Sequence, residues 1–264
     1  MIAISSKLVT WGMRVGSKTN KVQLKYTVGM KGSFPCSVNI FDTPSALNEN
    51  STIPVTALND TASLTGIIVF DRGVTERKVF EKLTENQRLF VTRVKTDVRY
   101  KVLETLQVGD KPKDATVIVN EDLWVHLKNG SDKWSNLKIR LIKAYICTTG
   151  EPIYFLSNVD NMSAYEIASI YKQRWEIECL FKFLKQHLNL SHLVTRNENG
   201  IKVMMYMTLI LSILLIAYKK LNNISSYKIA KIRFSNEIES EIVKQIVVLC
   251  GGNPLLAKHL FNDT

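Results

Sequence analysis

The stretch "GIIVFDRG" (residues 66–73) decides the fold class of this sequence. Its first half is a short, continuous apolar run rich in β-branched residues, which is typical of a strand buried on both faces. The run ends abruptly at Asp71, and residues 75–86, "TERKVFEKLTEN", then have helical character. Residues 88–94, "RLFVTRV", favour another strand. A strand, a helix and a second strand in this order predict a βαβ-like unit and therefore an α/β core.

Strand patterns also lie on both sides of this unit. Residues 21–30 and 33–41 are strand-like, and the short connection containing Gly32 predicts a hairpin. Residues 42–54 are polar and rich in turn formers, so we expect a loop there. Residues 97–157 hold several short strand patterns separated by the turn signals "KNGSDK" and "TTGE", which predict an antiparallel β insertion.

The sequence becomes helical after the insertion. Ser163 and Glu166 match the S-x-x-E capping box, which predicts a helix start. A final helix is predicted by isoleucines spaced by four that precede a Gly-Gly pair: Ile238, Ile242, Ile246, Gly251 and Gly252. We therefore expect an α/β fold with four parts: an N-terminal part of the core (1–96), the β insertion (97–158), core helices (159–222) and a C-terminal helical segment (223–264).

Composition and charge favour a globular protein with a polyanionic partner. Hydrophobic residues make up 45% of the 264 residues, and the formal net charge is +11. Residues 1–41 contain six basic side chains and no acidic one, and residues 182–233 contain nine basic side chains and a single acidic residue, Glu198. Two basic faces are therefore plausible, and nucleic acid is favoured over a membrane as the partner. The alternative is an ordinary solvated surface.

Cysteine usage and the termini favour a cytoplasmic protein. The four cysteines are far apart and form no C-x-x-C motif, which fits reduced thiols rather than disulfides or a zinc site. The first residues, "MIAISSKLVTWG", lack the features of a signal peptide. Residues 203–218 are free of charge for 16 residues. Because a membrane-spanning helix needs about 20 apolar residues, we expect a buried core helix, with membrane insertion as the alternative.

A polar row lies in the stretch "YKQRWEIECLFKFLK" (residues 171–185). If these residues form one helix, Tyr171, Arg174, Glu178 and Lys185 fall within an arc of about 60°. Arg can hold a phosphate group in a fork, Lys supplies a point charge and Tyr can stack or hydrogen-bond to a nucleotide. The row therefore suits a phosphate backbone. The alternative is that Glu178 only pairs with its basic neighbours on a solvated surface.

Asp71 favours the functional alternative. An Asp at the carboxyl end of a buried strand stands where α/β sheets usually place active sites, although it could also be a helix N-cap. If Asp71 and Glu178 meet in space, they form half of a carboxylate cluster for Mg²⁺, which prefers oxygen ligands. Two such ions about 4 Å apart support phosphodiester chemistry.

These residues resemble the signature of a known family. The spacing Y-(2)-R-(3)-E-(6)-K, formed here by Tyr171, Arg174, Glu178 and Lys185, is similar to that of a large subgroup of bacterial insertion-sequence DDE transposases. Asp71-Arg72-Gly73 after a buried strand resembles the second-Asp motif of that subgroup. The order of the expected elements agrees, and the resemblance covers about residues 20–220.

The resemblance implies an RNase H-like core interrupted by a β insertion between the second Asp and the Glu. It also implies Mg²⁺-dependent (or Mn²⁺-dependent) cutting of double-stranded transposon-end DNA and its transesterification to target DNA, by homodimers on paired ends in a bacterial cytoplasm and nucleoid. Asp71 and Glu178 would be the catalytic metal ligands. Arg174 and Lys185 would hold DNA phosphates, and Tyr171 would support them or stack on the DNA.

One family feature is missing. The first Asp of the family lies on the first core strand, but this sequence has no Asp before Asp42. Asp42 is followed by Thr43, and Ser or Thr usually follows the first Asp in the family, but Asp42 falls at the end of the second expected hairpin strand, which is the wrong element. We therefore expect a truncated transposase that does not cleave DNA by itself.

Two competing hypotheses stay open. One is a non-catalytic DNA-binding protein that uses the same basic faces, and the other is a membrane-associated protein built around residues 203–218. Trp124 and Trp134 are candidates for base stacking, although packing within hairpin strands is the simpler expectation for both. The four histidines show no metal-ligand spacing.

Overall fold

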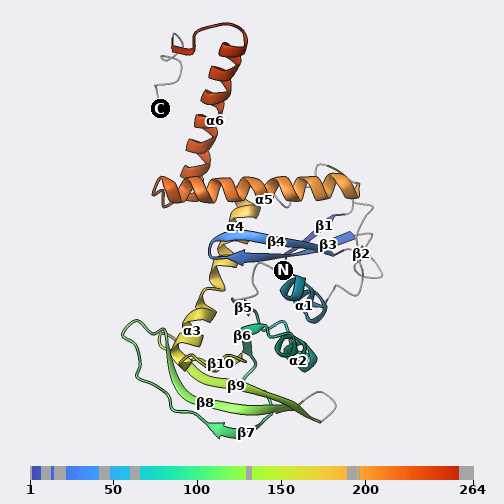
Figure 1. The fold of residues 1–264 in the computed structure, drawn as a ribbon, viewed down its shortest axis with the longest axis vertical. Helices are drawn as coiled ribbons and strands as arrows, with labels where there is room; N and C mark the ends of the chain where they lie inside the picture. Colours follow the sequence, from blue (N-terminus) through green and yellow to red (C-terminus); the bar gives the residue numbers. More distant parts are fainter. Residues whose placement is uncertain are drawn as a thin grey trace. The chain divides into compact units, whose positions relative to one another are not determined.

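The structure is a computed structural model that describes residues 2–6, 13–14, 22–41, 48–59, 66–128, 133–188, 195 and 197–255. The chain forms two compact units, Met1–Cys179 and Leu180–Thr264. The first unit contains two sheets with mainly antiparallel pairing, together with helices (Figure 1). The chain is therefore a mixed α/β protein, as predicted. The domain boundaries expected from the sequence stay predictions.

The larger sheet of the first unit has six strands in the order β5-β6-β10-β9-β8-β7. Of these strands, β5 and β6 pair in parallel, and every other neighbouring pair is antiparallel. The strands are β5 (Ile67–Phe70), β6 (Leu89–Val94), β7 (Tyr100–Thr105), β8 (Val117–Lys128), β9 (Trp134–Ile146) and β10 (Pro152–Ser157).

The parallel pair confirms the predicted strand–helix–strand unit. The register runs from Ile67 opposite Leu89 to Phe70 opposite Thr92. Helix α2 (Arg77–Glu85) connects the two strands and buries an apolar side that includes Phe80. Because the strands are parallel, their carboxyl ends lie at the same edge of the sheet.

Helices pack on both faces of this sheet. Neighbouring residues along one strand point to opposite faces, so Phe90 and Leu141 belong to the cluster that includes the apolar side of α2, whereas Val91 and Ile142 belong to a second cluster. The second cluster includes the buried side of helix α3 (Ala164–Lys172). Strand residues that are apolar at successive positions are therefore buried on both sides, as the continuous apolar runs predict.

The strands of the predicted insertion belong to the same sheet as β5 and β6. Two of the short strand patterns expected in this segment, at residues 115–120 and 123–127, are joined in the single strand β8, which begins at Val117 and whose register shifts between Val119 and Glu121. The segment is thus antiparallel, as predicted, and β10 joins it directly to β6.

A buried ion pair ties the insertion strands to the segment before α3. Arg140 on β9 donates to both carboxylate oxygens of Asp122 on β8, at 2.8 and 2.5 Å. Both side chains are almost fully buried, at 5% and 0% exposure. Arg140 also donates to the main-chain oxygens of Val159 and Met162. One guanidinium therefore fixes the position of the chain just before α3.

The smaller sheet contains the predicted hairpin. Strands β3 (Val22–Lys31) and β4 (Phe34–Phe41) pair antiparallel across a turn at Gly32, whose φ of 58° favours glycine. Strands β1 (Ile2–Ser6) and β2 (Met13–Arg14) pair with β3.

The prediction of a loop at residues 42–54 is wrong for residues 49–54, which the structure describes as helical. Helix α1 (Glu49–Asn59) begins there, with Pro54 inside it. Asn48 accepts the backbone N–H of Asn50 at 3.0 Å, which is a helix-capping contact. Buried residues such as Thr52 pack the helix into the unit, so tertiary contacts override the unfavourable proline. Asp42 lies outside the described residues.

Helix α3 begins at the predicted capping box. Ser163 accepts from the backbone of Glu166 at 3.2 Å, and the Glu166 carboxylate accepts from the backbone of Ser163 at 2.7 Å. These two hydrogen bonds lower the pKa of Glu166. The helix start therefore follows from four residues of local sequence.

The second unit contains the last turns of helix α4 (Trp175–His187), helix α5 (Glu198–Leu221) and helix α6 (Tyr227–Leu249). Phe183 stacks on Tyr227 with ring centroids 4.4 Å apart, and Lys231 donates to the main-chain oxygen of His187. Helix α6 ends as predicted, because Gly251 takes a φ of 77° and Gly252 donates to Val247.

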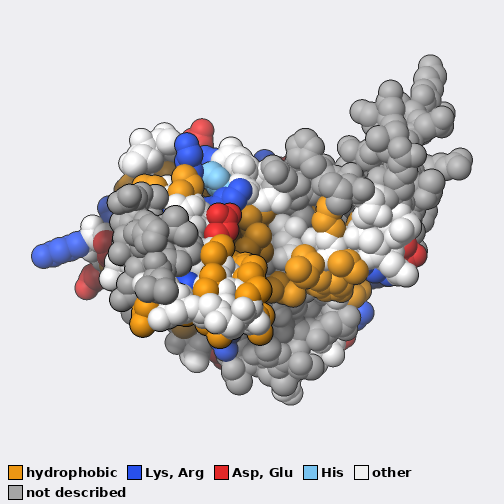
Figure 2. Space-filling model, turned by 90° about the horizontal axis from the view of Figure 1, so that it is seen from above, with side chains coloured by type: hydrophobic (Ala, Val, Ile, Leu, Met, Phe, Trp, Pro, Cys, Tyr) orange, Lys and Arg blue, Asp and Glu red, His pale blue; other side chains and the backbone are white. Residues whose placement is uncertain are grey.

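Helix α5 has two apolar sides, and only one of them is buried. The prediction of a buried core helix therefore holds for one side of α5. The buried side includes Ile201, Met205 and Leu209, and the exposed side includes Met207 and Ile210, at 61% and 52% exposure. Figure 2 shows hydrophobic side chains gathered in a band on the face seen from above. By length and composition α5 could also cross a membrane.

Candidate active site

Asp71 stands directly after β5, at the carboxyl edge shared by the two parallel strands. Its side chain is 55% exposed, and its Oδ1 accepts the backbone N–H of Arg72 at 2.8 Å. The hydroxyl of Thr92 on β6 donates to the main-chain oxygen of Phe70 at 3.0 Å. The strand end is thus held to its neighbour, while the carboxylate faces outward where a ligand can reach it.

The loop after Asp71 is held by the start of α1. The side-chain oxygen of Asn50, which is 9% exposed, accepts the backbone N–H groups of Thr75 and Glu76 at 2.7 and 3.0 Å. The Glu49 carboxylate lies against Gly73, where a Cβ would come within 1.5 Å of Oε2. Glycine at position 73 therefore leaves room for this close approach, which a side chain would disturb.

Tyr171 contacts Asp71 from the end of α3. Its hydroxyl donates to Asp71 Oδ1 at 3.3 Å, and its ring packs on Phe155 with centroids 5.3 Å apart. Burial, together with the Asp71 charge, raises the pKa of Tyr171 to about 12, although Arg174 and Arg93 oppose this rise. The ring is 7% exposed, which does not suit stacking on DNA, whereas the hydroxyl is well placed to orient Asp71.

Arg174 joins the two carboxylates. Its Nη1 donates to Glu178 Oε1 at 2.6 Å and lies 3.9 Å from Asp71 Oδ2. Burial lowers the pKa of Arg174, but the hydrogen bond to Glu178 and the negative charges of Asp71 and Glu178 outweigh burial and raise the pKa overall. The buried Nε has no hydrogen-bond partner among the described residues. Arg174 is thus fully charged and retains hydrogen-bonding capacity.

The geometry brings Asp71 and Glu178 close together. The same nitrogen of Arg174 lies 3.9 Å from an oxygen of Asp71 and 2.6 Å from an oxygen of Glu178. The distance between those two oxygens therefore cannot exceed the sum of these two distances. Two metal ions about 4 Å apart, each with ligands at about 2 Å, span roughly 8 Å. Both carboxylates are partly exposed, at 55% and 40%, and supply the oxygen ligands that Mg²⁺ prefers. The pair therefore fits a shared magnesium site.

The pair is not a complete metal cage. Across the part of the chain that the structure describes, there is no cluster of three or more His, Cys, Asp or Glu side chains with metal-binding geometry. Water and substrate phosphate commonly complete a Mg²⁺ site.

The expectation of one straight helix over residues 171–185 is wrong. Helix α3 ends at Lys172 and α4 begins at Trp175, with a turn at Gln173 and Arg174 between them. The turn has tightened hydrogen bonds, such as Arg174 N–H to the Tyr171 oxygen at 3.0 Å. The turn lets Tyr171 face the core while Arg174 and Glu178 face Asp71. The four residues therefore do not form one exposed row.

Lys185 is exposed on α4, two turns after Glu178 and within the second unit. The structure thus brings together Asp71, Tyr171, Arg174 and Glu178. A role of Lys185 on DNA stays a prediction.

Two further residues lie close to this site. Arg93 follows Thr92 on β6, and the parallel register places it beside Asp71. Trp175 opens α4 between two of the predicted site residues and is 62% exposed, which is unusual for a side chain of its size. Both residues could be noticed in the sequence, since a cation, Arg93, lies near the end of the expected strand 88–94 and Trp175 lies inside the 171–185 signature.

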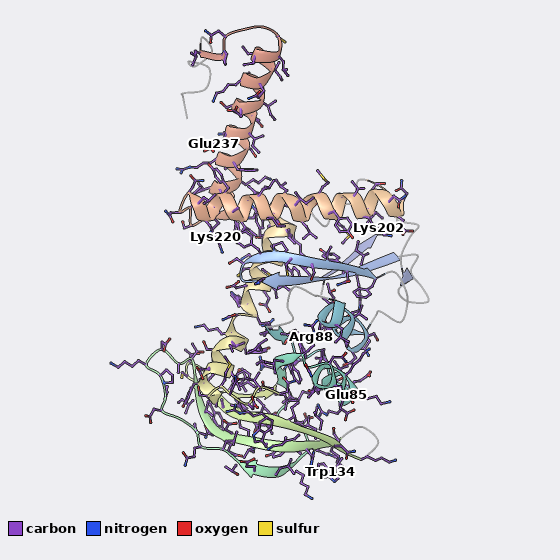
Figure 3. All side chains as sticks on the ribbon, viewed as in Figure 1. Glu85, Arg88, Trp134, Lys202, Lys220 and Glu237 are labelled. Atoms are coloured by element: carbon purple, nitrogen blue, oxygen red, sulfur yellow. The ribbon has the colours of Figure 1, made fainter. Side chains whose placement is uncertain are left out.

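The tryptophans of the insertion lie on the paired strands. Lys138 Nζ is 4.7 Å from the ring centroid of Trp124, and Lys128 Nζ is 5.7 Å from that of Trp134. Trp134 is 47% exposed at the start of β9 (Figure 3). Both contacts suit packing with lysine side chains on the sheet surface.

Comparison with known proteins identifies the family. Residues 7–214 match the family described as "Transposase DDE domain". The chain is 30% identical over 158 residues to a protein of Sinorhizobium fredii described as a transposase, covering 60% of this chain and 44% of that protein. It is 32% identical over 156 residues to a protein of Synechocystis sp. described as a transposase for insertion sequence element IS4SA, covering 57% of this chain and 40% of that protein. The chain thus spans less than half the length of these curated relatives.

A solved structure is also similar in part. The structure titled as a piggyBac transposase synaptic complex with hairpin DNA matches 93% of this chain and 53% of that chain, with 9% identity and a TM-score of 0.46. The family match covers most of the chain, so this chain belongs to the family described as "Transposase DDE domain".

Proposed function

We propose that this chain carries part of a transposase active site that cuts transposon-end DNA and joins it to target DNA by metal-dependent transesterification. The observation that carries the proposal is the approach of Asp71 and Glu178, which are more than a hundred residues apart in sequence, to one nitrogen of Arg174. Such convergence of carboxylates at a strand end suits phosphodiester chemistry better than a solvated surface does.

In this proposal Asp71 and Glu178 hold Mg²⁺ or Mn²⁺. When bound, such ions would activate the attacking oxygen and stabilise the leaving oxygen. The protein residues around them have separate tasks. Tyr171 orients the Asp71 carboxylate through its hydroxyl, and Arg174 neutralises both carboxylates until DNA phosphates and metal replace that contact.

The RNase H-like core and the Y-(2)-R-(3)-E-(6)-K subgroup belong to the same proposal. The support is the order of the elements, in which the β3–β4 hairpin, α1, β5, α2 and β6 precede the insertion strands and the Glu178 helix. The hairpin lies in a separate sheet from β5 and β6.

The partners proposed for the whole protein are double-stranded DNA and a second copy of the protein. The net charge of +11 supports a polyanionic partner. We place the protein in the bacterial cytoplasm, at the nucleoid. Because the sequence has no Asp before Asp42, we expect this chain alone to bind DNA but leave it uncut. Mg²⁺-dependent nicking of cognate ends by this chain would contradict that expectation.

Metal binding tests the assignment of the carboxylates. We expect Mn²⁺ binding, followed by electron paramagnetic resonance in the presence of DNA, to be lost in Asp71→Asn and Glu178→Gln. A matched control is Asp114→Asn, which changes an exposed carboxylate in a loop of the same unit. If both site variants bind Mn²⁺ as the unmodified chain does, the metal site is elsewhere and the proposal fails.

A non-catalytic DNA-binding protein is the second candidate. The observation in its favour is the 2.6 Å pair between Arg174 and Glu178, which already satisfies the carboxylate. In that case the unmodified chain binds no Mn²⁺ at this site. Asp71→Asn and Glu178→Gln then keep or improve its DNA affinity, because each removes a negative charge.

A further inference from the structure

A cationic cavity lies beside the carboxylate pair in the first unit. Its volume is about 720 Å³, which is within the range of small-molecule sites. Seven basic side chains line it, against three acidic ones. The basic residues are Arg72, Arg77, Lys78, Arg93, Lys95, Arg99 and Lys128. Such a wall is suited to a polyanion.

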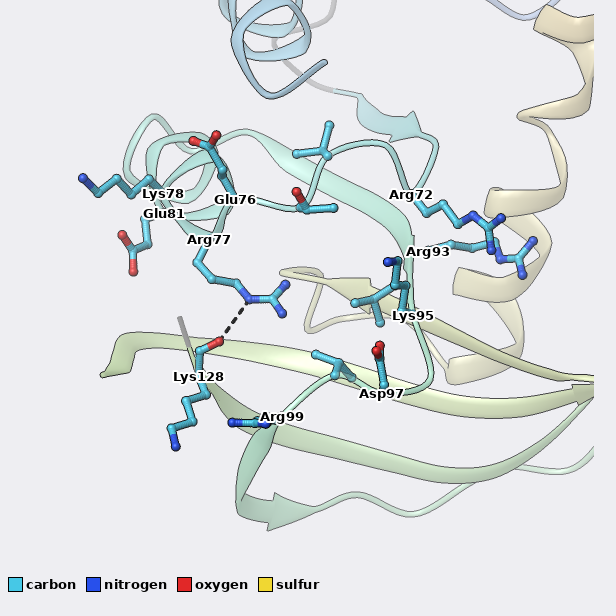
Figure 4. A pocket seen from close by; sticks show the side chains of 14 residues that line it. Arg72, Glu76, Arg77, Lys78, Glu81, Arg93, Lys95, Asp97, Arg99 and Lys128 are labelled. Atoms are coloured by element: carbon cyan, nitrogen blue, oxygen red, sulfur yellow. Dashed lines mark hydrogen bonds between the residues drawn. The ribbon is translucent and has the colours of Figure 1, made fainter. Parts of the chain in front are cut away.

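The cavity begins where the carboxylate site ends. Arg72 follows Asp71 directly, and Arg93 acts electrostatically on Tyr171. In Figure 4, Arg72 and Arg93 lie together at one end of the cavity, and Arg77, Lys95 and Arg99 lie further along it. A chain of anions that passes Asp71 could therefore continue into the cavity.

Several of these cations are available to a ligand. Neither Arg72 nor Lys95 has a salt-bridge partner among the described residues, and both are exposed. The buried Nε of Arg93 has no hydrogen-bond partner within the same residues. A buried donor without a partner is costly, and an anion would relieve that cost.

One wall of the cavity is fixed. Arg77, at the start of α2, donates through Nε to the main-chain oxygen of Lys128 at 3.5 Å, as Figure 4 shows. This contact joins α2 to the end of β8. It holds one edge of the guanidinium, and the remaining edge points into the cavity between them.

The side chains that line the cavity are suited to binding phosphate groups rather than bases. Among the described residues that line the cavity there is no aromatic side chain, and the apolar surface is formed by Val74, Val94 and Val98. Stacking platforms for bases are built from aromatic rings, whereas guanidinium and ammonium groups bind phosphate. The cavity is therefore suited to binding the sugar-phosphate backbone of a DNA strand, without contacts that distinguish one base from another.

We infer that this cavity binds successive backbone phosphates of the DNA strand that leads away from the Asp71–Glu178 pair. The inference rests on the proposed function, because it assumes that DNA lies across the carboxylates. It adds a sequence-independent anchor beyond Arg174, the cation that lies between the two carboxylates.

The test compares two matched double variants. Arg72→Gln/Lys95→Gln removes two exposed cations of the cavity, and Lys111→Gln/Lys113→Gln removes two exposed lysines of a loop outside it. DNA affinity is measured by fluorescence anisotropy with a labelled single strand, without divalent metal, between about 50 and 200 mM salt. We expect the cavity variant to weaken binding by about tenfold or more and to reduce the salt slope by about 1.4, at about 0.7 for each phosphate contact of a single strand. The control variant should change neither by a comparable amount.

Three outcomes overturn the inference. Equal losses in both variants mean that binding follows total charge, and no loss in either means that the strand takes another path. If the cavity variant loses affinity for inorganic tripolyphosphate but not for DNA, the cavity is a site for small anions.

The proposed function is tested separately by the Mn²⁺ measurement. If Asp71→Asn loses metal binding but the cavity variant binds DNA normally, the cavity inference is wrong and the metal assignment stands. If Asp71→Asn keeps metal binding but the cavity variant loses DNA affinity, the metal assignment is wrong and the cavity remains a DNA site. A chain that binds no DNA at all overturns both.

Discussion

Arg174 donates to Glu178 at 2.6 Å, and this contact places a cation between the two carboxylates of the site. The same nitrogen lies 3.9 Å from Asp71. A metal ion that uses these carboxylates must therefore compete with a guanidinium. Arg174 is in this sense a built-in counter-ion, which keeps two like charges close together when no metal is bound.

Substitution of Arg174 should separate metal binding from DNA binding. In Arg174→Gln the carboxylates lose their counter-ion, so we expect Mn²⁺ affinity to rise severalfold. DNA affinity should fall about tenfold or more, since a hydrogen bond to a charged group contributes about 1.5–3 kcal/mol. Titrations with Mn²⁺ and with labelled DNA measure the two effects. Lys172→Gln, an exposed change at the end of α3, is the control. Weaker Mn²⁺ binding in Arg174→Gln would contradict the competition.

Asn50 should determine the order of the loop after Asp71. Asn50→Ala removes the acceptor for two backbone N–H groups, so we expect a loss of about 1–3 kcal/mol in the free energy of unfolding. Faster hydrogen exchange at Thr75 and Glu76, measured by NMR, would locate the effect. Asn50→Asp keeps the acceptor oxygen and should protect those amides more than Asn50→Ala does. Equal exchange rates in all three proteins would show that the loop is held by other contacts.

Breaking the buried pair between Arg140 and Asp122 should strongly destabilise the fold. Arg140→Ala leaves a buried carboxylate without its partner, so we expect the free energy of unfolding to fall by about 3–5 kcal/mol. Urea denaturation followed by circular dichroism measures this change. The control is Lys138→Ala on the same strand. Its pair with Glu104 is half exposed on both sides, so this control should cost less than about 1 kcal/mol. Similar losses in the two variants would contradict the assignment.

Tyr26 should make stability fall at high pH. Its side chain is 0% exposed, and its hydroxyl has no hydrogen-bond partner among the described residues. Burial raises the pKa of Tyr26 above its ordinary value of 10.0. Above that value the unfolded chain ionises while the folded chain stays neutral, so stability is complete below about pH 10 and is lost as pH rises.

Tyr26→Phe tests this dependence. The variant should be about 1 kcal/mol more stable at neutral pH, because no buried hydroxyl remains unsatisfied. Its thermal stability should also fall less steeply above about pH 10. A variant that is less stable at neutral pH would indicate that the hydroxyl has a partner.

Local patterns in the sequence were sufficient for several elements. The apolar run before Asp71, the amphipathic segment of α2 and the Ser163–Glu166 capping box all lie where periodicity and capping chemistry predict them. Each of these signals involves residues within a few positions of one another. The strand end that carries Asp71 could therefore be predicted from the sequence alone.

The remaining features depended on contacts between distant residues. Helix α1 forms in a polar stretch containing Pro54, where its buried residues pack into the unit and Asn50 holds the loop after Asp71. The break at Gln173 and Arg174 could not be read from helical periodicity, which places Tyr171 and Glu178 on one face. In the fold the Tyr171 ring packs on Phe155 in the core, whereas Arg174 forms an ion pair with Asp71. Burial and charge pairing across a hundred residues decided that arrangement, because both act through space and leave no local period in the chain.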